Sequence, residues 1–170
     1  IEPAIKPAAM QTKSGLIGIL ATKGTLSSGL FGSTTNDYAS EIKIIEKNAE
    51  GLVELIEKGF IDGNKIEKNL KKYLFPMVYK GIDHLVLGCT HYPLLKDAIT
   101  RYTKNIKLVD SASATAKEAN IILKKYNLKN TAEKSYILDC FVTDLPMKFE
   151  RLGKTFLGEP VGRPQLVNDI

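Results

Sequence analysis

Apolar residues along this chain fall into short runs that alternate with longer segments of helical spacing. The short runs predict buried strands, at Gly15–Ala21, Ile42–Ile45, His84–Leu87, Ile106–Val109 and Tyr136–Val142. The segments with an apolar helical face predict helices, at Asn64–Tyr79, Pro93–Tyr102, Ser113–Tyr126 and Pro146–Phe156. Alternation of this kind indicates right-handed βαβ units, so we expect an α/β fold with a mostly parallel sheet. We expect two lobes to separate near the loop Leu128–Lys134.

Polar and ionisable residues gather directly after three of the predicted strands. These segments are Ala21–Thr25, Gly88–Pro93 and Asp110–Ser113. In open parallel sheets, ligands bind outside the carboxyl ends of the strands. The three segments should therefore converge on one candidate site.

Composition narrows the class of protein. The chain has 170 residues, 44% of them hydrophobic, which is enough for one sizeable core or two small ones. No apolar run is long enough to span a membrane. The net charge of +5 comes mostly from scattered lysines rather than from arginines interleaved with aromatic residues, which disfavours nucleic acid as a partner. A solvated basic surface explains this charge more simply.

The first residues of the chain and its two cysteines bear on where the protein is located in the cell. The opening IEPAIKPAAMQTK has no apolar core of a signal peptide and no initiator methionine, so we expect an upstream part of the parent protein to be missing. Cys89 and Cys140 do not make a disulfide framework, and a reducing cytoplasmic location fits best. With His84 and His91 as the only histidines and no Cys-x-x-Cys, we expect no metal.

The stretch VLGCTHYPLL, residues 86–95, carries the strongest chemical signal. Cys89 stands where a strand ends and a helix is about to begin, a place that favours a thiolate nucleophile or base. His91 could tune the thiol, pass a proton or bind a carboxylate, and Thr90 offers a hydroxyl and an N–H to an anion. The simpler interpretations are a small buried cysteine and a helix-capping histidine.

Other candidates have structural interpretations of similar weight. Thr22 and Thr25 flank a glycine in ATKGT, which suits a ligand-facing turn or an ordinary turn from strand to helix. Glu57 ends a short apolar helix-like segment and is unremarkable as a surface acid. Asp110 and Ser111 are most simply a helix cap. Cys140, inside an apolar strand, is expected to be a core residue.

Taken together, these motifs resemble the glutamate racemases of the aspartate/glutamate racemase family. The stretch VLGCTHYPLL is similar to the family's C-terminal catalytic motif, and the likeness covers nearly the whole chain. It extends to further segments in the family's order: IEPAIKPAA, GLIGILATKGTLSSGLF, GLVELIEKG, LVDSASATAKEA and FVTDLPMKFERLGKTFLGE.

The resemblance implies interconversion of L- and D-glutamate by two thiols, without metal or pyridoxal phosphate and so with no cofactor. Inversion needs an acid and a base on opposite faces of the α-carbon. Cys89 would be the base for the L-enantiomer, assisted by His91, which also favours glutamate over aspartate. Thr90 and His91 would bind substrate, with Thr22, Thr25 and Glu57 as further binding residues. The product would supply D-glutamate for peptidoglycan, and hence cell-wall biogenesis and cell shape.

The sequence also departs from the family. The second cysteine motif and the other N-terminal lobe motifs are absent, and Cys140 matches a structural strand. We therefore expect residues 1–110 to be a three-layer α/β lobe carrying the catalytic motif. Residues 111–170 would return a strand and a helix to a mostly absent first lobe. That tail should be unstable unless the missing N-terminal lobe or a partner covers it.

Alternatives remain open at this point. The chain could be a truncated, inactive relative that keeps only ligand or partner binding. A thiol-dependent hydrolase would use Cys89 to form an acyl intermediate rather than to exchange a proton. A basic binding module would lose affinity steeply with salt. The resemblance leaves homodimerisation undecided.

Overall fold

The computed structural model describes residues 2–39, 41–130 and 138–167. The chain divides into two compact units, residues 1–129 and 130–170, each with its own internal contacts. The boundary falls inside the loop Leu128–Lys134, part of which lies outside the described residues. The expected division between residues 110 and 111 refers to the two lobes of a longer protein and not to compact units within this chain. It therefore stays a prediction.

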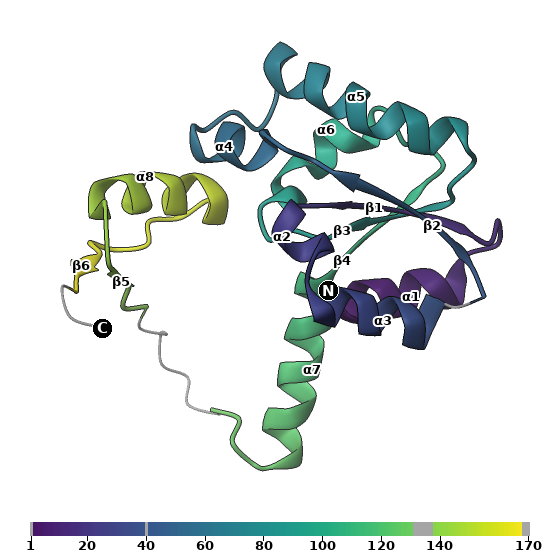
Figure 1. The fold of residues 1–170 in the computed structure, drawn as a ribbon. Helices are drawn as coiled ribbons and strands as arrows, with labels where there is room; N and C mark the ends of the chain where they lie inside the picture. Colours follow the sequence, from purple (N-terminus) through teal and green to yellow (C-terminus); the bar gives the residue numbers. More distant parts are fainter. Residues whose placement is uncertain (1, 40, 131–137, 168–170) are drawn as a thin grey trace. The chain divides into compact units, whose positions relative to one another are not determined.

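The first unit is a parallel sheet covered on both faces by helices (Figure 1). Its strands are β1 (Leu16–Ala21), β2 (Lys43–Asn48), β3 (His84–Leu87) and β4 (Lys107–Asp110), in the order β2-β1-β3-β4. Every pairing in this sheet is parallel, which confirms the expected α/β class. The helices are α1 (Glu2–Gln11), α2 (Lys23–Leu26), α3 (Gly29–Ala39), α4 (Leu52–Glu57), α5 (Asn64–Tyr79), α6 (Lys96–Thr100) and α7 (Ser111–Lys125), with a 3₁₀ turn η1 (Tyr92–Leu95).

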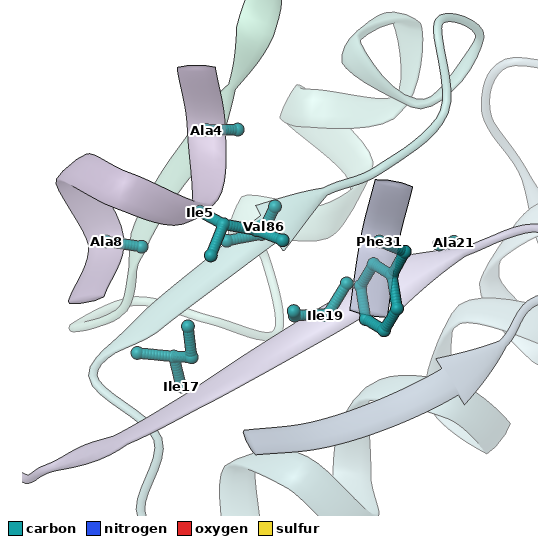
Figure 2. Close-up of a cluster of buried hydrophobic side chains, with 8 residues drawn as sticks. All are labelled: Ala4, Ile5, Ala8, Ile17, Ile19, Ala21, Phe31 and Val86. Carbon is teal, nitrogen blue, oxygen red and sulfur yellow. The ribbon is translucent and has the colours of Figure 1, made fainter. Parts of the chain in front are cut away.

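One face of the sheet packs against α1 and α3. Side chains of alternate strand residues meet the apolar face of α1 and the ring of Phe31 from α3 (Figure 2). This cluster consists of Ala4, Ile5, Ala8, Ile17, Ile19, Ala21, Phe31 and Val86, each almost fully buried. Because β1 and β3 are buried on both faces, their sequences read as continuous apolar runs rather than as an alternation.

The other face of the sheet packs against α5, and a glycine sets how closely it packs. A Cβ placed on Gly18 would lie 2.8 Å from the Ile82 side chain and 3.0 Å from the sulfur of Met77. A larger residue here would require the ends of these two side chains to shift. The buried face of α5 carries Ile66, Leu70, Tyr73, Leu74 and Met77.

The pattern-based expectations succeed for the most periodic segments. The predicted helix Asn64–Tyr79 and strand His84–Leu87 coincide with α5 and β3. The helix expected from Pro93 starts as the 3₁₀ turn η1 before α6 follows. Helix α3 was not expected, because its sequence GLFGSTTNDYA is rich in poor helix formers and owes its form to packing on α1.

The second unit holds β5 (Phe141–Val142), α8 (Pro146–Leu157) and β6 (Gln165–Leu166), with β5 and β6 paired in parallel. The strand expected at residues 136–142 is too long: residues 138–140 are not strand, and residues 136–137 lie outside the described residues. The expectation that Cys140 is a core residue is also wrong, since it is only half-buried.

Asp83 ties the turn between α1 and β1 to the start of β3. Its carboxylate accepts hydrogen bonds from the backbone N–H groups of Lys13 at 2.6 Å and Ser14 at 2.8 Å, and from the Thr12 hydroxyl at 2.7 Å. Its Oδ1 also lies 2.8 Å from Nδ1 of His84. Burial raises the pKa of Asp83, but these hydrogen bonds together hold it well below its ordinary value.

We expect Asp83→Asn to lower the free energy of unfolding by about 2 kcal/mol, because the amide turns an NH₂ toward backbone donors that need an acceptor. The loss should be present at neutral pH. It should shrink as the pH falls below about 4. A carboxyl whose pKa is depressed in the folded state contributes its full stability above its unfolded pKa and loses it as the pH falls toward the folded pKa. Urea unfolding at several pH values measures both effects.

Asp37→Asn is the matched control, since Asp37 is an exposed residue of α3. It should change stability by less than about 0.5 kcal/mol. Equal stability of the Asp83→Asn variant and the wild type at pH 7 would contradict the assigned role of the Asp83 carboxylate.

Candidate functional site

The carboxyl ends of β1, β3 and β4 meet at one hollow of about 380 Å³. Its lining residues are Gly24, Thr25, Ser28, Leu30, Gly88, Cys89, Thr90 and Ser111. All three segments that the sequence analysis expected to converge contribute to it. Ser28 and Leu30 were not singled out there; the available signal was their position just after α2, the short helix that carries Thr25.

Cys89 and His91 lie close together at this edge of the sheet. The half-buried Cys89 has its Sγ 3.8 Å from Nδ1 of His91, which is within the looser range for a contact to sulfur. The Thr90 hydroxyl lies 3.5 Å from the same nitrogen. The imidazole therefore faces both the thiol and the hydroxyl, and can exchange a proton with the sulfur.

Glu57 continues this chain of ionisable groups from another element. Its Oε1 lies 3.6 Å from Nε2 of His91, and both side chains are partly exposed. Glu57 is the last residue of α4, so its position depends on where that helix sits. A carboxylate on the far ring nitrogen helps to hold the imidazole in one orientation.

Two buried tyrosines fix the loop that leads into α4. The hydroxyl of Tyr92 donates to the Ala49 carbonyl at 3.2 Å, and that of Tyr73 donates to the Glu50 carbonyl at 2.8 Å. Burial, followed by the nearby charges, raises the pKa of Tyr92, so this phenol stays protonated and can donate. The segment from Cys89 to Tyr92 thus carries both His91 and an anchor for the helix that bears Glu57.

Thr22 and Thr25 are engaged with the protein itself. Thr22 caps α2 by accepting from the Thr25 N–H at 3.4 Å, and the two hydroxyl oxygens lie 3.1 Å apart. Thr25 lines the hollow with Cys89, whereas Thr22 lines a neighbouring hollow of about 610 Å³ at the ends of β1 and β2. The two threonines are therefore in direct contact, although they line two neighbouring hollows.

Asp110 caps α7 as expected, by accepting from the Ala112 N–H at 2.8 Å. It also pairs with Lys96. Burial raises the pKa of Asp110, but the hydrogen bonds from Lys96 and from backbone N–H groups lower it by more. The net pKa is below the ordinary value, so the carboxyl stays ionised. This cap holds the start of α7, and with it Ser111, at the rim of the hollow.

Residues 2–39, 41–130 and 138–167 present neither a metal-binding cluster nor a membrane-spanning helix. No group of three or more His, Cys, Asp or Glu side chains is placed to hold a metal ion. No helix in these segments has the length and apolar character needed to cross a membrane.

Comparison with known proteins gives concordant findings. Residues 1–119 match the family described as Asp/Glu/Hydantoin racemase. The chain is 35% identical over 168 residues to a glutamate racemase of Neisseria meningitidis serogroup C, covering 99% of this chain and 62% of that protein. It is 37% identical over 163 residues to one from Persephonella marina, covering 95% of this chain and 60% of that protein.

Solved structures give the same result for the fold. A glutamate racemase isoform from Bacillus anthracis superposes with a TM-score of 0.86 at 27% identity, covering 99% of this chain and 63% of that one. One from Francisella tularensis, solved in complex with D-glutamate, gives 0.82 at 28% identity, covering 95% and 61%. The chain thus spans less than two thirds of the length of the relatives that it matches.

We expect Tyr92→Phe to lower the free energy of unfolding by about 1 kcal/mol, because the Ala49 carbonyl loses one of its two hydrogen bonds and keeps only the one from the Leu52 N–H. The loop into α4 should also loosen, which would show as changed amide shifts from Gly51 to Glu57 in ¹H–¹⁵N spectra. Tyr102→Phe is the matched control, since Tyr102 packs edge-on against Phe75 away from the site. Unchanged α4 shifts in Tyr92→Phe would contradict the anchoring role of Tyr92.

Proposed function

Because the chain belongs to the Asp/Glu/Hydantoin racemase family, we propose that it takes part in interconverting L- and D-glutamate without a cofactor, with Cys89 as one of two thiol acid/bases. The observation that carries the proposal is the contact of Cys89 with His91 at the ligand-binding edge of the sheet. The named activity of relatives that match nearly the whole chain supports glutamate as the substrate.

The α-proton of an amino acid is a very weak acid, so its removal needs a well-placed base and a site that stabilises the carbanion-like state. In this proposal the Cys89 thiolate takes the α-proton of L-glutamate. A thiol on the opposite face of the α-carbon gives up its own proton to the same carbon. The product is D-glutamate, and the two sulfurs have exchanged protonation states, so the site is set for the reverse reaction.

His91 and Glu57 prepare the thiol for this step. His91 accepts the thiol proton before the reaction, and Glu57 stabilises the imidazolium that results. Thr90, on the rim of the hollow, binds the substrate carboxylate. Thr25 completes the wall on the β1 side, and Thr22, which lines the neighbouring hollow, supports Thr25.

Cys89 is the only cysteine of residues 1–129, and the resemblance assigns Cys140 to a structural strand rather than to the site. We propose that the second thiol belongs to an N-terminal lobe like the part of the relatives that this chain does not match. The same lobe would cover the apolar side chains of the second unit. In the cell, the activity would supply D-glutamate for peptidoglycan in the cytoplasm, and the enzyme could act as a homodimer.

The test is α-proton exchange in heavy water, followed by proton NMR and optical rotation. A chimera that joins this chain to the unmatched part of the Neisseria relative should racemise both enantiomers of glutamate. Cys89→Ala in the chimera should lower the rate by about 10²–10⁴-fold, the usual contribution of a positioned acid or base. Cys140→Ala is the matched control and should keep the chimera's activity. The chain alone should exchange L-glutamate without inverting it.

Two outcomes would contradict the proposal. Equal activity of the Cys89→Ala and parent chimeras would remove Cys89 from the reaction. A folded chimera that exchanges neither enantiomer would favour the alternative of an inactive relative that keeps only binding. Calorimetric titration of the chain with glutamate would then show whether ligand binding survives.

A further inference from the structure

The backbone hydrogen bonds between β1 and β3 end at Gly88, one residue before Cys89. The Gly88 N–H donates to the Leu20 carbonyl at 2.8 Å, as the last backbone rung between the two strands. If the parallel ladder continued, the Gly88 carbonyl would accept from the backbone N–H of the residue after Ala21. Instead, β1 ends at Ala21 and Thr22 caps the short helix α2.

A side chain takes the place of that missing rung. The Thr25 hydroxyl lies 3.3 Å from the Gly88 carbonyl oxygen and donates to it. Among the described hydrogen bonds, this is the one that reaches the Gly88 carbonyl from β1 or its connection. Thr25 thus links the turn after β1 to the residue that precedes Cys89.

Proton counting fixes the direction of the neighbouring bonds. Because the single hydroxyl proton of Thr25 goes to Gly88, the short contact between the two threonine hydroxyls must be donated by Thr22. The Thr25 N–H in turn donates to the Thr22 oxygen. Both hydroxyl protons are therefore used within the protein, and neither is left to donate to a substrate carboxylate.

From this arrangement we infer that Thr25 is a positioning residue for Cys89, with Thr22 as its support. The peptide between Gly88 and Cys89 is planar, so holding the Gly88 carbonyl also sets the direction of the Cys89 N–H and of its Cα. That direction determines where the Sγ lies relative to Nδ1 of His91. The inference concerns thiol geometry and does not rest on the proposed racemase activity.

The test measures the alkylation rate of Cys89 by iodoacetamide in the 170-residue chain, with site-resolved mass spectrometry to separate Cys89 from Cys140. Thr25→Val should slow alkylation of Cys89 about fivefold, the size of one ordinary hydrogen bond. Thr25→Ser, which keeps the hydroxyl, should restore the wild-type rate. If Thr25→Val does not fold by circular dichroism, Thr25→Ala makes the same deletion and is expected to give the same slowing.

A double-mutant cycle with His91→Ala distinguishes positioning from general damage. If Thr25 acts by holding Cys89 against His91, Thr25→Val should have little further effect in the His91→Ala background. Thr35→Val is the matched control, because the Thr35 hydroxyl donates to the Gly32 carbonyl in α3, away from the site; it should alkylate like the wild type. Wild-type alkylation of Thr25→Val, or equal slowing with and without His91, would overturn the inference.

Discussion

The parallel pairing of β1 with β3 is the constraint on which the site depends. The register Leu20 opposite Leu87 ends both strands at the same edge of the sheet. Because both strands are buried on both faces, a slip by one residue would exchange their two faces and misplace Gly18 beneath α5. The apolar core therefore fixes, at a distance, the position at which Cys89 leaves the sheet.

At that edge, side chains take over the hydrogen bonds that the ladder no longer supplies. The Thr25 hydroxyl donates to the Gly88 carbonyl, and the Tyr92 hydroxyl donates to the Ala49 carbonyl. The Asp110 carboxylate accepts from a backbone N–H in the first turn of α7. Buried backbone groups need partners, so each strand end must be completed by a polar residue. Thr25, Tyr92 and Asp110 are thus required by the fold before any chemistry is assigned to them.

The sequence predicted what depends on local periodicity. The apolar spacing of Asn64–Tyr79 and the run His84–Leu87 decide their structures within their own length. Helix α3 was not predicted, because its sequence has a low helix propensity. Burial of Phe31 and Thr34 against the rest of the unit outweighs that propensity.

The site likewise has features that the sequence predicted and features that it could not. The edge rule for parallel sheets brought the three strand-end segments together, and the structure agrees. The contact of Glu57 with His91 joins positions far apart in the chain, and no spacing could reveal it. The same holds for the loop anchored by Tyr73 and Tyr92, since each hydroxyl reaches a carbonyl that only the tertiary fold brings near.

The two units differ in what their side chains can accomplish alone. The first closes a core around β1 and β3 and supplies a thiol, an imidazole and a carboxylate from two elements. The second has two-residue strands, and Phe141, Leu145 and Met147 are more than half exposed. Strand pairs this small are stable only when packed against a larger apolar surface.

Inversion at carbon imposes a matching requirement on the chemistry. An acid and a base must act from opposite faces of the α-carbon, whereas Cys89, Thr90 and His91 all belong to one turn at one edge of the sheet. A single such turn can exchange a proton on one face but cannot deliver one to the other. Under the proposed function, a further lobe would both cover the exposed apolar surface of the second unit and complete the one-sided chemistry of the first.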